Sequence, residues 1–89
     1  MQNSFVFIGH ISSIEPENKR IFMKEVGEGY AGVLPITLAD GVASNAGPYL
    51  KKDAVVGIKG YMKYDGISVR LIATKMTFLS SGNPTEQNN

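Results

Sequence analysis

The sequence contains no cysteine, no tryptophan and only one histidine, His10. The lack of cysteine excludes disulfide bonds, thiolate metal sites and cysteine nucleophiles. With a single imidazole, the other ligands of a zinc ion would have to be carboxylates or water. We therefore expect neither a metal nor another cofactor. No apolar run approaches the about 18 residues that a membrane span requires. These absences favour a cytoplasmic protein that makes no contact with a membrane.

A strong net charge is also missing, because nine Lys and Arg stand against eight Asp and Glu, giving a formal charge of +1 at pH 7. The charges are nevertheless unevenly distributed. Residues 51–75 contain six of the cations but only two of the acidic residues. The chain is therefore dipolar along its length, and its positive part is suited to a polyanionic partner.

With 89 residues, of which 43% are hydrophobic and 19% charged, the chain has the size and composition of one globular domain. Alternating β-branched and aromatic residues predict strands, and Pro, Gly and Asn mark the connections. Asp40 is expected to cap a short helix that Gly47-Pro48 ends, and Asp65-Gly66 predicts a tight hairpin. We expect strands over residues 5–11, 20–26, 33–38, 54–63 and 67–79, and the helix over 41–46.

Five strands with one short helix between the third and the fourth is the order of a five-stranded OB-fold barrel, an all-β fold. An SH3-like barrel is the alternative, but it has no natural place for the insertion over residues 39–50. We expect the domain to occupy residues 1–79, and residues 80–89 to form a disordered polar tail.

Cations and aromatic rings alternate on the side of two predicted strands that faces away from the core. Cations neutralise phosphates and rings stack on unpaired bases, so this pattern favours binding of single-stranded nucleic acid. An ordinary solvated sheet face is the competing interpretation. We expect the two strands to adjoin, with these residues on the shared face: Arg20, Phe22 and Lys24 on the second strand, and Lys59, Tyr61 and Lys63 on the fourth.

Two patterns that would indicate enzymatic chemistry fail in their context. Gly27 to Gly32 formally matches the GxGxxG of dinucleotide sites, but the following segment is strand-like where such a site requires a helix. The carboxylates lie in expected turns and near loops, and nothing pairs His10 with a nucleophile. We therefore expect a binding protein and not an enzyme.

Three segments in order resemble the bacterial and phage single-stranded DNA-binding protein family: FIGHI at 7–11, YLKKDAVVGIKG at 49–60 and IATKMTFL at 72–79. The resemblance spans residues 4–79, and the family includes a primosomal relative of similar size. It implies an OB-fold over which single-stranded DNA wraps and stacks on aromatic side chains. It also implies a homodimer or homotetramer, and we expect the first strand to be the interface because two aromatics so near the terminus need cover.

The resemblance implies roles at individual positions. His10 and Lys63 stand where the family has polar or basic contacts, and Tyr30 stands where it has a stacking Trp. Phe22 and Tyr64 stand for further aromatic contacts. Together with the charge pattern, this gives the expected DNA-binding residues: His10, Arg20, Phe22, Lys24, Tyr30, Lys59, Tyr61, Lys63, Tyr64 and Arg70.

The chain also departs from the family. Ile36 stands where the family usually stacks a Phe, the hairpin at residues 64–66 is trimmed, and the acidic tail is missing. Such a shortened version suits a protein of a phage or mobile element, acting in DNA replication, recombination or repair in the cytoplasm of a bacterial cell or of an infected host. A primosome-like adaptor and an RNA-binding OB module remain alternatives, because neither stacking nor phosphate contact senses the 2′-hydroxyl.

Overall fold

The computed structural model describes residues 3–25 and 32–80. One short helix, α1 (Asp40–Ala46), lies between the third and the fourth strand, and two 3-10 turns, η1 (Pro16–Asn18) and η2 (Gly47–Tyr49), complete the order. The strands are β1 (Phe5–Glu15), β2 (Arg20–Glu25), β3 (Leu34–Leu38), β4 (Val55–Tyr64) and β5 (Val69–Ser80).

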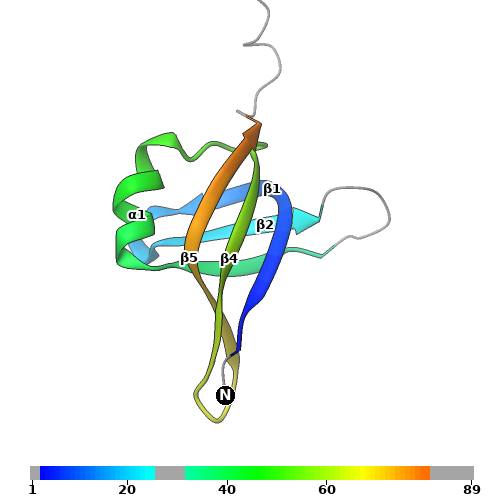
Figure 1. The fold of residues 1–89 in the computed structure, drawn as a ribbon, viewed down its shortest axis with the longest axis vertical. Coiled ribbons are helices and arrows are strands. Elements are labelled where there is room, and N and C mark those ends of the chain that lie inside the picture. The colour runs from blue at the N-terminus through cyan, green and yellow to red at the C-terminus, as the bar shows by residue number, and fades with distance from the viewer. Residues whose placement is uncertain (1–2, 26–31, 81–89) are drawn as a thin grey trace, which may run out of the picture.

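The strands close into a barrel in the order β1-β2-β3-β5-β4, and β4 pairs back with β1 (Figure 1). Every neighbouring pair is antiparallel except β3 and β5, which run parallel where Thr37 meets Ile72 and Leu38 meets Ala73. This confirms the expected all-β barrel of five strands with a short helix between the third and the fourth.

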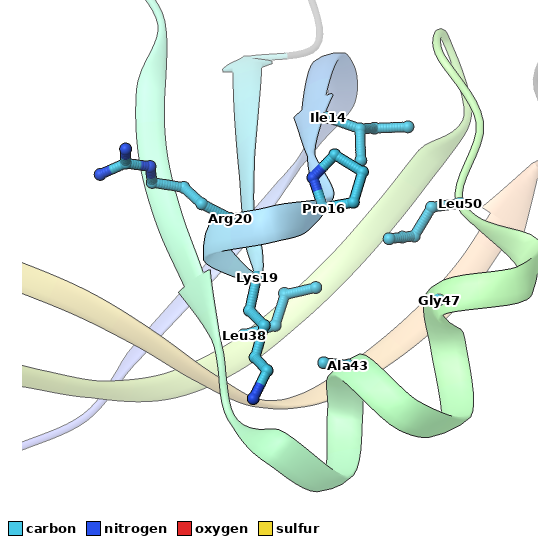
Figure 2. A pocket seen from close by; sticks show the side chains of 8 residues that line it. All are labelled: Ile14, Pro16, Lys19, Arg20, Leu38, Ala43, Gly47 and Leu50. Carbon is cyan, nitrogen blue, oxygen red and sulfur yellow. The ribbon is translucent and has the colours of Figure 1, made fainter.

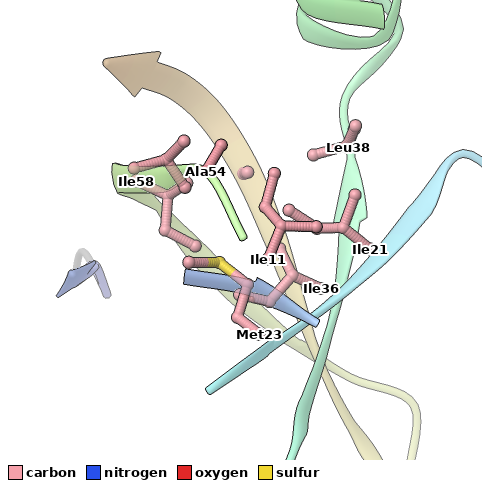
Figure 3. Packing of buried hydrophobic residues seen from close by; sticks show 9 residues of the cluster. Ile11, Ile21, Met23, Ile36, Leu38, Ala54 and Ile58 are labelled. Atoms are coloured by element: carbon pink, nitrogen blue, oxygen red, sulfur yellow. The ribbon is translucent and has the colours of Figure 1, made fainter. Parts of the chain in front are cut away.

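Alternate residues of the strands fill the barrel interior (Figure 3). Ile21 and Ile36 lie opposite each other on β2 and β3, and both are fully buried. Ile11 and Met23 form the matching pair on β1 and β2. Burying one such side chain contributes about 1.5–3 kcal/mol. The expected phase of the second strand is confirmed, with Ile21 and Met23 inside and their neighbours outside.

The two aromatics of β1 were expected to need cover from another copy of the chain. The structure contradicts that reason. Phe5 and Phe7 point inward and pack against the core cluster, whereas the apolar residues left on the exterior of this strand are Val6 and Ile8. The alternation of β1 is therefore offset by one residue from what the interface argument assumed.

Asp40 does not cap α1, contrary to the expectation. The N-cap position is Ala39, without a side-chain capping bond, and Asp40 is already in the first helical turn. Its carboxylate instead accepts a hydrogen bond from Lys19 Nζ at 3.0 Å. Gly47-Pro48 ends the helix as expected by turning the chain into η2.

Barrel closure depends on a close approach at Gly60. A Cβ on this residue would overlap the carbonyl oxygen of Ile72, so β4 can meet β5 at this distance only without a side chain. At the same point the register of β5 shifts by one residue, and the hydroxyl of Thr74 donates to the carbonyl of Lys59 at 3.2 Å. The resulting bulge lets β5 bend from β4 toward β3.

Within the described ranges, no helix has the length and apolar character of a membrane-crossing segment.

Candidate nucleic-acid interface

One row of residues crosses the exterior of four strands. Arg20 on β2 lies opposite Thr37 on β3, and Thr37 pairs with Ile72 on β5. Ile72 in turn lies opposite Tyr61 on β4. Directly paired residues project from the same face of a sheet, so Arg20 and Tyr61 share one exterior face through β3 and β5.

Further rings and cations extend this row along the strands. Phe22 lies opposite Pro35 on β3, and Lys63 lies opposite Arg70 on the hairpin that joins β4 to β5. Ile72 is nearly buried although it is outside the core cluster, which indicates that side chains of this face, such as the neighbouring Tyr61, cover it. We call the set the aromatic–cationic face; it comprises Arg20, Phe22, Lys24, Tyr61, Lys63 and Arg70.

Arg20 is held in place by two neighbours. Its Nε donates to Glu15 Oε1 at 2.8 Å, and its Cζ stands 5.5 Å from the centroid of the Phe22 ring, a cation–π distance. The hydrogen bond from Arg20, followed by one from Asn18, lowers the pKa of the Glu15 carboxyl below its ordinary value. Arg20 therefore lies over the Phe22 ring and shares its charge with Glu15.

The other cations of the face form no ion pair with the part of the chain that the structure describes. Among residues 3–25 and 32–80, the ion pairs are those of Lys19 with Asp40 and of Arg20 with Glu15. Lys24 and Lys63 have no ion pair in these ranges, and Arg70 has none either, although it lies near enough to Asp65 to help lower the pKa of that carboxyl. A polyanion that crosses β2 and the β4–β5 hairpin would meet these three cations and two rings.

The expected adjacency of the second and fourth strands is wrong. β1 separates β2 from β4 on one side of the barrel, and β3 and β5 separate them on the other. Lys59 consequently lies opposite Val6 on β1 and Lys75 on β5, away from β2. The sequence pattern gave the correct side of each strand but not the path that joins them.

His10 and Lys24 form a neighbouring pair at the edge of the face. The two residues lie directly opposite each other on β1 and β2, and His10 is half-buried. An imidazole next to an ammonium group is suited to a phosphate contact. Phe22 lies next to this pair, because it is two residues before Lys24 on β2 and projects from the same side of the strand.

The β4–β5 hairpin has two chemically different faces. Tyr61, Lys63 and their partners belong to the aromatic–cationic face, whereas Met62 lies opposite Leu71 and Tyr64 opposite Val69 on the other side. Tyr64 is 68% exposed there. A strand of nucleic acid that stacks on both tyrosines would therefore have to cross the edge of the hairpin.

Two residues assigned from the resemblance have different outcomes. Ile36 is fully buried in the core and cannot stack on a base. Tyr30, with most of the Gly27 to Gly32 loop, lies outside the described residues.

A pocket of about 370 Å³ opens at the end of the barrel between η1 and α1 (Figure 2). Its lining is mostly apolar, and its two cations, Lys19 and Arg20, are the ones already paired with acidic residues. Lys19 Nζ, its one amine, is held by the Asp40 carboxylate at 3.0 Å. The residues that line the pocket are Ile14, Pro16, Lys19, Arg20, Leu38, Ala43, Gly47 and Leu50.

Comparison with known proteins gives structural relatives only. No protein-family model matches the chain, and no sequence among the curated proteins matches it. The mitochondrial single-stranded DNA-binding protein Rim1 of S. cerevisiae superposes with a TM-score of 0.77 at 20% identity, covering 93% of this chain and 99% of Rim1. The S. pombe Stn1–Ten1 complex gives 0.65 at 19% identity over 94% of this chain and 62% of the matched chain. The dimeric N-terminal domain of PriB from Thermoanaerobacter tencongensis gives 0.63 at 15% identity, covering 86% of this chain and 96% of that domain.

The chain has an OB-fold. The resemblance seen in the sequence is confirmed in the structure, because the solved relatives include single-stranded DNA-binding proteins and the primosomal PriB. At these identities the agreement concerns the fold, and the site must be argued from this chain's own residues.

Sequence reasoning missed the residues in the middle of the face. Thr37 and Ile72 connect its two halves, and they meet only because β3 and β5 pair in parallel. No local pattern signals a pairing between residues so far apart in the chain. The near burial of Ile72 on the exterior could not be anticipated either, since it follows from that pairing.

Proposed function

We propose that the protein binds single-stranded DNA, with little dependence on sequence, across the aromatic–cationic face. The observation that carries the proposal is the row from Arg20 to Tyr61, which joins the β2 part of the aromatic–cationic face to its hairpin part. The joined face has two rings, Phe22 and Tyr61, and three cations that form no ion pair with the described residues. Bases stack on rings whatever their identity, and cations neutralise the backbone. His10 extends the contact at the β1 edge of the face, and Tyr64 extends it on the far side of the hairpin. Tyr30 and Lys59 complete the expected set of DNA-binding residues. DNA replication, recombination or repair would be the setting.

The test is a comparison of labelled oligo-dT with duplex DNA of equal length. Stacking requires unpaired bases, so oligo-dT should bind far more tightly than the duplex. Equal affinity for the two would refute the proposal. Oligo-rU in the same assay distinguishes the RNA-binding alternative, and loss of all nucleic-acid binding would favour an adaptor of the primosomal kind.

We also propose that the chain forms a homodimer or homotetramer through the exterior of β1. Val6 and Ile8 are 70% and 52% exposed there, and with Leu79 they line a shallow groove of about 270 Å³ over β1, β4 and β5. Apolar side chains in such a strip favour a self-complementary interface. Sedimentation should give two or four times the 9.6 kDa chain mass, and Ile8→Asp should give the monomer. A wild-type monomer at micromolar concentration would contradict this.

A further inference from the structure

The β4–β5 hairpin leaves the barrel beyond Gly60, the last residue of β4 that pairs with β1. Beyond Gly60, β4 pairs with β5 alone, and β5 pairs with β3 up to Ile72, the partner of Tyr61. From Met62 and Leu71 to the Tyr64–Val69 pair the ladder consists of β4 and β5, and Figure 1 shows the hairpin projecting from the barrel. Its base is braced by a hydrogen bond that the amide of Met62 donates to Asn3 Oδ1 at 2.7 Å. The tip therefore extends beyond the other strands of the barrel.

The tip has a fixed shape. Asp65 Oδ1 accepts hydrogen bonds from the amides of Ile67 and Ser68, each at 2.9 Å, and the amide of Asp65 donates to the carbonyl of Ser68 at 3.2 Å. Gly66 supplies the positive φ of 95° that the turn requires. These bonds, that from Ser68 first, also lower the pKa of the Asp65 carboxyl, so it stays ionised and keeps accepting them near neutral pH.

The residue that this turn presents is apolar. Ile67 is 90% exposed at the outermost part of the hairpin, although polar residues and glycine are favoured in turns. Immediately behind it lie Lys63 and Arg70 on one side of the hairpin and Tyr64 on the other. A rigid aliphatic point with cations behind it combines an apolar contact with phosphate neutralisation.

We infer that this tip is a wedge for the junction between single-stranded and duplex DNA. Ile67 covers the exposed face of the last base pair, while Lys63 and Arg70 hold the phosphates of the strand that leads onto the aromatic–cationic face. An unpaired, flexible base gives an aliphatic side chain little fixed surface to pack against. A terminal base pair exposes a flat apolar surface that lies between phosphates. Aliphatic wedges act in this way between base steps. The inference rests on the proposed single-strand binding and adds to it a preference for a place on the DNA.

Charge decides between this partner and a protein partner. The hairpin beyond Gly60 carries two cations, Lys63 and Arg70, against one acidic residue, Asp65. The Asp65 carboxylate accepts two hydrogen bonds within the turn and is also attracted by Arg70, so Lys63 is the cation of the tip that no acidic group of the hairpin offsets. This charge complements a polyanion, whereas a second copy docked at the same tip would bring its own Lys63 and Arg70 to the contact.

The experiment compares a duplex that carries a single-stranded dT tail with the tail alone and with the blunt duplex, using the full chain. The wild type should bind the tailed duplex about three- to tenfold more tightly than the tail, a gain of the size of burying one or two CH₂ groups of Ile67. Ile67→Ser should remove that preference and leave the affinity for the tail unchanged. Ile67→Leu should keep the preference, and Ser68→Ala, a matched change at the same tip, should behave as wild type.

Each other result has a distinct meaning. Equal wild-type affinity for the tail and the tailed duplex would overturn the wedge and leave single-strand binding intact. Failure to bind the tail at all would overturn the proposed function, and the wedge with it. If Ile67→Ser lowers the affinity for the tail as much as the affinity for the tailed duplex, Ile67 contacts the single strand itself and the wedge is refuted. If Ile67→Ser lowers the mass in solution, the tip is a contact between copies, which also refutes it.

Discussion

Replacing Tyr61 with alanine tests the aromatic–cationic face most directly. The ring is 41% exposed and lies between Lys59 and Lys63 on the exterior of β4. It also lies opposite Ile72, which is nearly buried on that side. The substitution therefore removes a surface on which a base can stack and uncovers one aliphatic neighbour.

The two consequences differ in size. Loss of one stacked base should weaken binding of oligo-dT by about 1–3 kcal/mol, which is roughly 5- to 150-fold in affinity. The stability cost is that of a cross-strand pair, about 1 kcal/mol, and not the roughly 3–5 kcal/mol of an emptied aromatic core site. For a chain of this size the melting temperature should fall by about 4–8 °C.

Fluorescence anisotropy with labelled oligo-dT and a thermal melt measure both quantities on the same variants. Tyr61→Phe keeps the ring and should bind almost as the wild type does. Tyr49→Ala removes an equally aromatic, exposed side chain on η2, outside the face, and should leave binding unchanged. Unchanged binding by Tyr61→Ala, or an equal loss by Tyr49→Ala, would refute stacking at this position. A collapse of the melting temperature would show that Tyr61 is a core residue.

Three further outcomes follow from the same geometry. The logarithm of the affinity for oligo-dT should fall with the logarithm of the salt concentration at a slope of about −2 to −3, because three or four cations meet phosphates and each contributes roughly −0.7. A slope near zero would mean that the face is only solvated and does not contact phosphates. Gly60→Ala should lower stability by about 3 kcal/mol or more, because its Cβ would overlap the Ile72 carbonyl, whereas Gly57→Ala meets its nearest side chains at 3.8 and 3.9 Å and should melt as the wild type does. The folded-state pKa of Glu15 is depressed below 4.5, so the ionised carboxylate stabilises the fold above that pH, and this contribution is lost as the pH falls through the folded-state pKa. The stability of Glu15→Gln should therefore lack this dependence on acid pH. Identical acid-unfolding curves for the variant and the wild type would contradict it.

Local chemistry in the sequence was sufficient to predict the five strands and the sides of β2. Alternation at Ile21 and Met23 against Phe22 and Lys24 decides which side chains enter the core, because period two belongs to any half-buried strand. The same reasoning put Tyr61 and Lys63 outside. It also put Met62 on the core side of β4, and there it was incomplete, since Met62 lies on the hairpin beyond the barrel and is exposed.

Features that depend on distant parts of the chain could not be predicted in this way. β1 continues to Glu15 through an irregularity between Ile11 and Ser13, because β2 offers it partners as far as Arg20. Asp40 binds Lys19 and does not cap the helix, and Lys19, which follows η1, comes near the helix only in the closed barrel. In both cases a residue's local preference was outweighed by a partner that the sequence does not place nearby.

Barrel closure and the candidate site depend on the same contact. The parallel pairing of Thr37 with Ile72 seals the barrel, and it is also the step that joins the half of the face on β2 to the half on the hairpin. A change at Gly60 displaces the Ile72 backbone, so it would disturb the fold and the face together, and a binding defect in that variant would not identify a contact. Lys63 lies farther along the hairpin, exposed and without an ion pair among the described residues, so its removal acts on the ligand alone. Loss of affinity in Lys63→Ala with an unchanged melting temperature would therefore be evidence for direct contact with the nucleic acid, which no substitution at the closure can provide.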